Sequence, residues 1–298
     1  MSARLLLLCP GQGGQHSAMF DVARTDTGAA AFLDSAGLSA IDPATMFDNC
    51  VAQPAIVAAT LAMWEALRRR LPAPRLVAGY SVGELSAYGV AGALDPLEAV
   101  RLAAMRAALM DAAVAAPQAL VAMSGMSVER ARVLAAVHGF DIAIVTGHDT
   151  CIAGGLDSEL DKFEHAVTAA GAKLQRLPVG IASHTRWMAP AVAPFAGALA
   201  HAQVHPQTCP VLSGIGAEAV NSKTRAVATL SRQLSETIVW SDCMDAAAEA
   251  GITVALELGP GAALARMLQS RQPQIACRSV ADFRSLDGIV SWLDRAMA

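Results

Sequence analysis

Short apolar runs alternate with alanine-rich stretches along the first third of the chain, and this alternation limits the possible folds more than any other feature. Strand-length runs occupy residues 4–10 ("RLLLLCP") and 75–80 ("RLVAGY"), and helical stretches occupy residues 54–70, 84–90 and 96–113. Strands that alternate with helices pair in parallel, because each helix returns the chain to the same end of the sheet. The pattern predicts an α/β fold with a parallel sheet flanked by helices.

The pattern changes between residues 117 and 184. This segment contains a strand, a helix, two short strands, a second helix and a final strand ("AKLQRLPVGIAS"), which is the β-α-β-β-α-β order of a ferredoxin-like unit. Further helices and "TVALELGPGAALARML", a strand, a turn and a helix, then restore the first pattern. We therefore expect a large discontinuous α/β domain at 1–116 and 185–298, interrupted by a small ferredoxin-like α+β subdomain at 117–184.

Composition excludes several classes of protein. The 298 residues carry a net charge of -4 and no run of like charge longer than Arg68-Arg69-Arg70, which disfavours a nucleic-acid partner. The 6 cysteines are far apart without a C-x-x-C pair, so we expect neither a metal site nor disulfides. The first residues contain only a four-leucine run, and no uninterrupted apolar stretch reaches about 18 residues. We expect a soluble, cytoplasmic protein with no membrane partner.

The stretch "AGYSVGEL" places Ser81 between a predicted strand and a predicted helix. Gly79-x-Ser81-x-Gly83 has the form of a nucleophile elbow, in which the serine is lifted out of the sheet and the Val82 N–H can donate to an oxyanion. Ser81 and Glu84 also fit a capping box, a purely structural alternative. The stretch itself leaves both interpretations open.

The glycine loop in "CPGQGGQ" follows the first predicted strand. Gly11-x-Gly13 is not completed to G-x-G-x-x-G, because His16 stands at the last position, and no P-loop lysine follows. The loop lies at the end of the sheet where parallel sheets bind ligands, so the Gln12 N–H is a candidate oxyanion donor. A plain turn explains the loop equally well.

A nucleophilic serine needs a base, and His184 is the best placed of the 7 histidines because it follows the last strand of the insert. Arg106 is the second candidate. Its neighbours at three and four residues are all apolar, namely Leu102, Ala103, Leu109 and Met110. A cation without a local acid partner suits a carboxylate substrate, although an acid brought close by folding is an equal alternative.

Together these residues resemble the malonyl-CoA:acyl carrier protein acyltransferase family over nearly the whole chain. The shared motifs are Pro10-Gly11-Gln12-Gly13, the elbow at Ser81, Arg106 placed 25 residues later, and Ser183-His184. The resemblance implies an α/β-hydrolase-like large domain in which Ser81 is the nucleophile and His184 the base. It further implies Gln12 and Val82 as oxyanion-hole donors, Arg106 as the malonyl carboxylate ligand and the main chain of Val239 as the group that orients the histidine.

By the same resemblance the chain binds no cofactor of its own. Malonyl-CoA is the substrate, and the prosthetic-group thiol of an acyl carrier protein is the acceptor. "GYSVGEL" and "RQLSETIVWSDC" are most similar to the epsilon subunit of malonate decarboxylase, which implies the carrier subunit of that enzyme as partner. The alternatives are a transacylase of fatty acid or polyketide synthesis, a serine thioesterase or hydrolase, and a non-catalytic carrier-docking protein.

Overall fold

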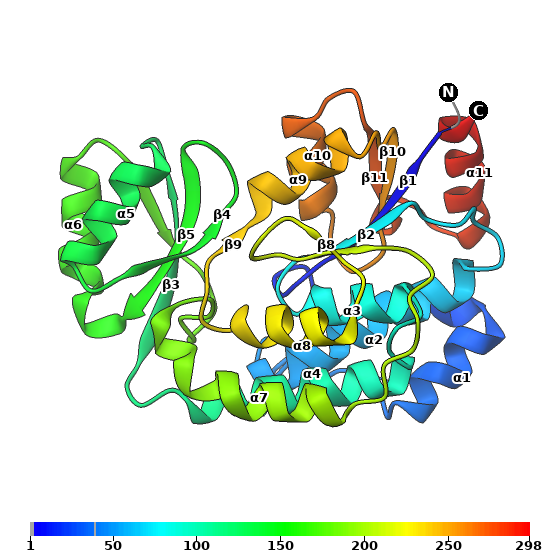
Figure 1. Ribbon diagram of the computed structural model, residues 1–298, viewed down its shortest axis with the longest axis horizontal. Helices are drawn as coiled ribbons and strands as arrows, with labels where there is room; N and C mark the ends of the chain where they lie inside the picture. The colour runs from blue at the N-terminus through cyan, green and yellow to red at the C-terminus, as the bar shows by residue number, and fades with distance from the viewer. Residues whose placement is uncertain (1–2, 39) are drawn as a thin grey trace.

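The computed structural model describes residues 3–38 and 40–298 and contains two sheets that lie side by side (Figure 1). In spatial order, the larger sheet consists of β11 (Ala276–Ser279), β10 (Val254–Glu257), β1 (Leu5–Cys9), β2 (Leu76–Gly79), β7 (Val211–Leu212) and β8 (Ala219–Val220). Its first five strands pair in parallel, and β8 is antiparallel to β7. The predicted α/β class with a parallel sheet is confirmed.

Helices cover both faces of the larger sheet. On one side lie α2 (Asn49–Leu67), α3 (Gly83–Val90) and α4 (Pro96–Ala112), and on the other lie α9 (Trp240–Glu249) and α10 (Ala263–Arg271) (Figure 1). Leu5 and Leu7 of β1 belong to the first core cluster, and Leu6 and Leu8 to the second. Side chains alternate along a strand, so the unbroken apolar run "LLLLC" fits a strand buried on both faces.

The smaller sheet contains, in spatial order, β6 (Lys173–Arg176), β3 (Gln118–Ser124), β5 (Thr150–Leu156), β4 (Asp141–Val145) and β9 (Ile238–Val239). Along the chain, β3, β4, β5 and β6 occur with α5 (Val128–Val137) and α6 (Leu160–Ala169) in the β-α-β-β-α-β order predicted for the insert. The strand β9 comes from outside 117–184 and pairs in parallel with β4. The domain boundaries themselves stay a prediction.

The two sheets are joined by a shared core. On β3, Ala119 and Val121 pack in a cluster with Phe163 of α6, whereas Leu120 belongs to the cluster that includes Trp240 of α9. The face of the smaller sheet away from α5 and α6 therefore packs toward the larger one.

The remaining helices complete the cover of the larger unit. Helix α7 (Ala189–His201) packs against α4 and α8 (Lys223–Arg232), while α1 (Thr27–Ser35) packs against α2, and α11 (Leu286–Met297) ends beside the start of the chain (Figure 1). Four 3-10 turns, η1 to η4, cover Ala23–Thr25, Asp157–Glu159, Arg186–Met188 and Val280–Asp282. By length and hydropathy α2 could cross a membrane, but 78% of its apolar window is buried, which identifies it as a core helix.

One predicted strand is wrong in its extent. The sequence suggests a strand from 172 to 183, but β6 ends at Arg176. It is an edge strand, paired only with β3 among the described strands, and Pro178 lacks the N–H that continued pairing requires. His184 therefore follows an irregular segment and not the end of a strand.

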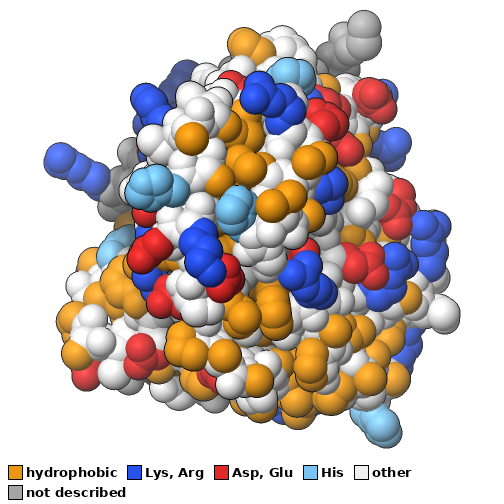
Figure 2. All heavy atoms as spheres, turned by 90° about the vertical axis from the view of Figure 1, so that its left-hand side faces the viewer, with side chains coloured by type: hydrophobic (Ala, Val, Ile, Leu, Met, Phe, Trp, Pro, Cys, Tyr) orange, Lys and Arg blue, Asp and Glu red, His pale blue; other side chains and the backbone are white. Residues whose placement is uncertain are grey.

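Figure 2 shows the side of the molecule that carries α5 and α6, where hydrophobic side chains lie among charged ones. Two valines of α5 are well exposed, Val133 at 68% and Val137 at 75%, beside a groove of about 390 Å³. Nothing in the structure indicates what covers this surface.

Candidate active site

Ser81 occupies a sharp turn between β2 and α3. Its φ is 56°, a left-handed value that a non-glycine residue adopts only under constraint. The flanking glycines are required by close approach: a Cβ on Gly79 would lie 2.3 Å from the backbone of Glu84, and a Cβ on Gly83 would lie 2.2 Å from the Cys9 carbonyl oxygen. These contacts explain the G-x-S-x-G spacing as the geometry of a nucleophile elbow.

The capping-box interpretation of Ser81 is wrong. Helix α3 begins at Gly83 with Val82 as its N-cap and without a side-chain cap. The Ser81 hydroxyl lies instead 2.8 Å from Nε2 of His184. The Glu84 carboxylate points away from Ser81 and accepts hydrogen bonds from the Gly214 N–H and the Gln233 side chain.

His184 is held in one orientation by the segment that follows α8. Its backbone N–H donates to the Leu234 carbonyl (2.8 Å), and Nδ1 lies 2.6 Å from the Gln233 carbonyl. Because a carbonyl can only accept, the proton sits on Nδ1, and Nε2 is free to accept the Ser81 hydroxyl proton. Burial, together with the nearby Arg106 cation, lowers the pKa of His184 to about 3. The imidazole is therefore a neutral base at physiological pH.

The prediction that Val239 orients the histidine is wrong, because the structure assigns that contact to Gln233. Gln233 directly follows the last residue of α8, where the final carbonyls of a helix have no intrahelical partner. Val239 lies in β9, where it pairs with Val145 and donates its N–H to Gly214.

Arg106 reaches the same point from α4. Its guanidinium donates to the side-chain oxygens of Gln53 (2.7 Å) and Gln233 (3.4 Å), and one Nη lies 3.4 Å from the Ser81 hydroxyl. Arg106 is 2% exposed, and no ion pair links it to an acid within residues 3–38 and 40–298. Burial lowers the pKa of Arg106 to about 10, partly opposed by Glu84. The side chain is thus a buried cation with neutral partners.

The two candidate oxyanion donors lie beside the elbow. A Cβ on Gly11 would be 3.4 Å from Cβ of Ser81, so the loop that contains Gln12 packs directly on the serine. In the described part of the chain, no hydrogen-bond acceptor is assigned to the backbone N–H of Gln12 or of Val82. Their position and unused N–H groups agree with the predicted donor role, which stays a prediction.

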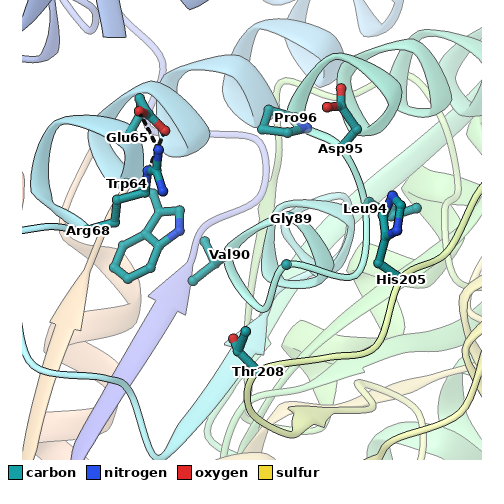
Figure 3. A pocket seen from close by; sticks show the side chains of 11 residues that line it. Trp64, Glu65, Arg68, Gly89, Val90, Leu94, Asp95, Pro96, His205 and Thr208 are labelled. Atoms are coloured by element: carbon teal, nitrogen blue, oxygen red, sulfur yellow. Dashed lines mark hydrogen bonds and ion pairs between the residues drawn. The ribbon is translucent and has the colours of Figure 1, made fainter. Parts of the chain in front are cut away.

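Two cavities border residues of the site, one at His184 and the other at Tyr80, the residue before Ser81. One, of about 550 Å³, includes His184, Arg186 and Val239 in its lining, and the other, of about 780 Å³, includes Tyr80 and Met267. Figure 3 shows a different pocket, of about 530 Å³, which includes Val90 at the far end of α3. Eight helical residues, about 12 Å, separate that end from the elbow, so this pocket is remote from Ser81.

Residues 7–284 match the acyl transferase domain family. The chain belongs to this family. The malonyl CoA-acyl carrier protein transacylase of Mycobacterium tuberculosis is 32% identical to it over 96% of the chain and 99% of the relative. A malonyl-CoA:acyl carrier protein transacylase structure from Xanthomonas oryzae is 26% identical with a TM-score of 0.91, covering 99% of each chain. A structure of a type II polyketide synthase acyl-carrier protein in complex with its malonyl-transacylase is 24% identical with a TM-score of 0.92. The match covers 97% of this chain and 99% of the other, and it supports the fold alone.

In this acyltransferase the structure brings together Ser81, His184 and Arg106, which are far apart in sequence. Sequence reasoning missed three buried polar residues around them: Gln53, Glu84 as a site residue, and Gln233. A signal exists for Gln53 alone, because it is a polar residue within an otherwise apolar helical stretch. Gln233 is separated from Arg106 by 127 positions and shows no pattern that could pair them.

Proposed function

We propose that this acyltransferase moves a malonyl group from malonyl-CoA to the thiol of an acyl carrier protein through an ester on Ser81. His184 takes the hydroxyl proton through Nε2 while Ser81 Oγ attacks the thioester carbonyl. The tetrahedral oxyanion is stabilised by the N–H groups of Gln12 and Val82. Collapse releases the coenzyme A thiol, which receives the proton from His184.

The second half-reaction mirrors the first. The carrier thiol enters, His184 accepts its proton, and the thiolate attacks the Ser81 ester. Collapse of that intermediate forms the new thioester, and His184 returns the proton to the Ser81 oxygen. Because one base serves both steps, the 2.8 Å contact between Ser81 and His184 in the free protein is the geometry that each half-reaction needs.

Arg106 carries the choice of malonyl. It is a buried cation 3.4 Å from the nucleophilic oxygen, and among the described residues the guanidinium is hydrogen-bonded only to neutral groups. In a malonyl thioester the free carboxylate lies two bonds from the reacting carbonyl carbon, so it falls within reach of this guanidinium when Ser81 attacks. A charged acyl group therefore gains a bond that acetyl cannot form.

The identity of the carrier is the finer part of the proposal. The relatives described above carry transacylase names, which favours an acyl carrier protein of fatty acid or polyketide synthesis. A malonate decarboxylase carrier subunit is a second candidate, suggested by Tyr80 before the nucleophile. Tyr80 packs edge-on against Trp240 at 5.2 Å and borders the larger cavity, so it can contact an incoming prosthetic group.

The test compares acceptors. Purified protein charged with malonyl-CoA is offered a phosphopantetheine carrier and a carrier bearing a phosphoribosyl-dephospho-CoA group, and transfer is followed by intact mass. We expect malonyl transfer to the first and little to the second. Equal or better transfer to the second would favour the decarboxylase assignment, and hydrolysis without transfer to either would support a thioesterase.

A further inference from the structure

Three buried side chains, two from helices and one from the residue that follows α8, form a continuous hydrogen-bonded row beside Ser81. Arg106 of α4 donates to the side-chain oxygen of Gln233, whose Nε2 donates to the carboxylate of Glu84 in α3. Glu84 also accepts the Gly214 N–H at 3.0 Å. Glu84 is 0% and Gln233 1% exposed, so water does not screen this row.

The order of the row fixes the orientation of the Gln233 amide. A guanidinium only donates, so an oxygen must face Arg106, and Oε2 of Glu84 is an acceptor because it also accepts the Gly214 N–H. If the amide were reversed, its NH2 would face the guanidinium and its oxygen would face the carboxylate, so both hydrogen bonds would be lost. Only one orientation satisfies both neighbours, and it presents a neutral oxygen to Arg106.

The same order keeps the Glu84 carboxyl group, whose pKa burial raises to about 8, out of direct contact with the guanidinium. Glu84 is close enough to oppose the fall in the pKa of Arg106, yet Gln233 lies between the two groups. A carboxylate in direct contact with Arg106 would occupy the positions that the substrate carboxylate needs, and it would have to be displaced on binding. A neutral amide can be exchanged for the substrate at much lower cost.

We propose that Glu84 and Gln233 form a specificity-determining pair, in which the amide of Gln233 separates a buried carboxylate from the carboxylate-binding Arg106. The pair is a positioning device and touches no reacting atom. This inference rests on the proposed malonyl transfer. It explains why a buried glutamate lies directly after the nucleophile elbow without capping the helix there.

The test exchanges the two side chains. The double variant E84Q/Q233E keeps one carboxyl group and one amide, nearly the same volume and a hydrogen bond at every link. It places the carboxyl group against Arg106, which stabilises the ionised form of that group. We expect the swapped protein to fold and to retain acetyl transfer. Its kcat/KM for malonyl-CoA should fall about a hundredfold or more, as when a buried ion pair loses one of its partners. The ratio of malonyl to acetyl kcat/KM is the readout.

Two single variants isolate the cause. Glu84→Gln removes the carboxyl group but leaves the amide of Gln233 beside Arg106, so its malonyl-to-acetyl ratio should exceed that of the swap by at least tenfold. Glu257→Gln is the matched control, because Glu257 is also a fully buried carboxylate but bonds the N–H of Ala265 in α10. Its ratio should equal that of the native protein.

Each other result overturns the inference. A swapped protein that keeps its malonyl preference, or that loses malonyl and acetyl transfer equally, shows that the pair does not set specificity. A Glu84→Gln ratio far below that of the native protein and as low as that of the swap shows that the position of the carboxyl group is not the cause. This result also overturns the inference if the swap fails to fold. If the native protein itself shows no malonyl preference, the proposed function fails and not this inference alone.

Discussion

Replacement of Arg106 by alanine separates substrate choice from chemistry. The guanidinium lies 3.4 Å from the Ser81 hydroxyl but is not a hydrogen-bond partner of His184, which takes the proton. Removing it should leave that pair and the candidate oxyanion donors able to process an uncharged acyl group. We therefore expect malonyl transfer to fall while acetyl transfer is unchanged or improves.

The magnitude follows from burial. A buried ion pair that loses one partner typically costs about 3–5 kcal/mol, which is roughly a hundred- to several-thousand-fold in kcat/KM. The free protein pays a separate cost, because the side-chain oxygens of Gln53 and Gln233 lose their donor, at about 1–3 kcal/mol for each buried group. The variant no longer has to bury the Arg106 cation, and the removal of that desolvation penalty offsets part of this cost. The variant should therefore still fold.

The assay measures kcat/KM for malonyl-CoA and acetyl-CoA with a common carrier, together with thermal melting. Arg106→Lys should recover only part of the malonyl rate, because it restores the charge without the planar fork. The acetyl pH profile gives a second readout: Arg106 helps to lower the pKa of His184, so its loss should move the acid limb to higher pH. An equal loss for both acyl groups would refute the carboxylate-binding role.

Three further predictions concern the rest of the site and the core. Ser81→Ala and His184→Ala should each lower the rate of malonyl transfer at least about a thousandfold, and the double variant should be little worse. Additive losses would contradict a cooperating pair. Mass spectrometry of the native protein should locate malonyl on Ser81. The acid limb of native kcat/KM should lie well below pH 6.5, because burial holds the pKa of His184 at about 3, and a limb at the ordinary value would refute the buried neutral base. Burial raises the pKa of Glu257 to about 7, so the native state binds more protons than the unfolded state from about pH 4.5 to 7, and the free energy of unfolding falls as pH rises through this range. In urea unfolding, Glu257→Gln should remove on the order of 3 kcal/mol of that fall. An unchanged dependence of the free energy of unfolding on pH would show that the carboxyl is unperturbed.

The parts of the fold that follow from local pattern could be predicted from sequence. The run "LLLLC" and the Asp95-Pro96 helix start depend on neighbours within a few residues, and β1 and α4 appear where expected. The two-residue strands β7, β8 and β9 carry too few residues to show a period and form only because a neighbouring strand offers its edge. The overlong strand at 172–183 fails for a related reason, since Leu177, Val179 and Ile181 pack in the core clusters without forming a strand.

The candidate site divides in the same way. The elbow at Ser81 and the apolar neighbours of Arg106 in its helix are local features, so both residues could be identified from short stretches of sequence. The carbonyl that accepts from His184 is set by tertiary structure, because it depends on where α8 ends relative to a segment some fifty positions earlier in the chain. The family resemblance pointed to Val239 instead. The pairing of Arg106 with Gln233 is equally non-local.

The turn that follows α8 links the base to the carboxylate ligand. The Leu234 carbonyl accepts the backbone N–H of His184, and the Gln233 carbonyl accepts the ring proton on Nδ1. The Gln233 side chain contacts Arg106. His184 has a φ of 63°, a conformation that costs about 1–3 kcal/mol and persists only where surrounding contacts impose it. A shift of this turn must therefore disturb proton transfer and carboxylate binding together, whereas an exchange of the Gln233 side chain alone leaves the backbone contacts to His184 in place and changes only the choice of acyl group.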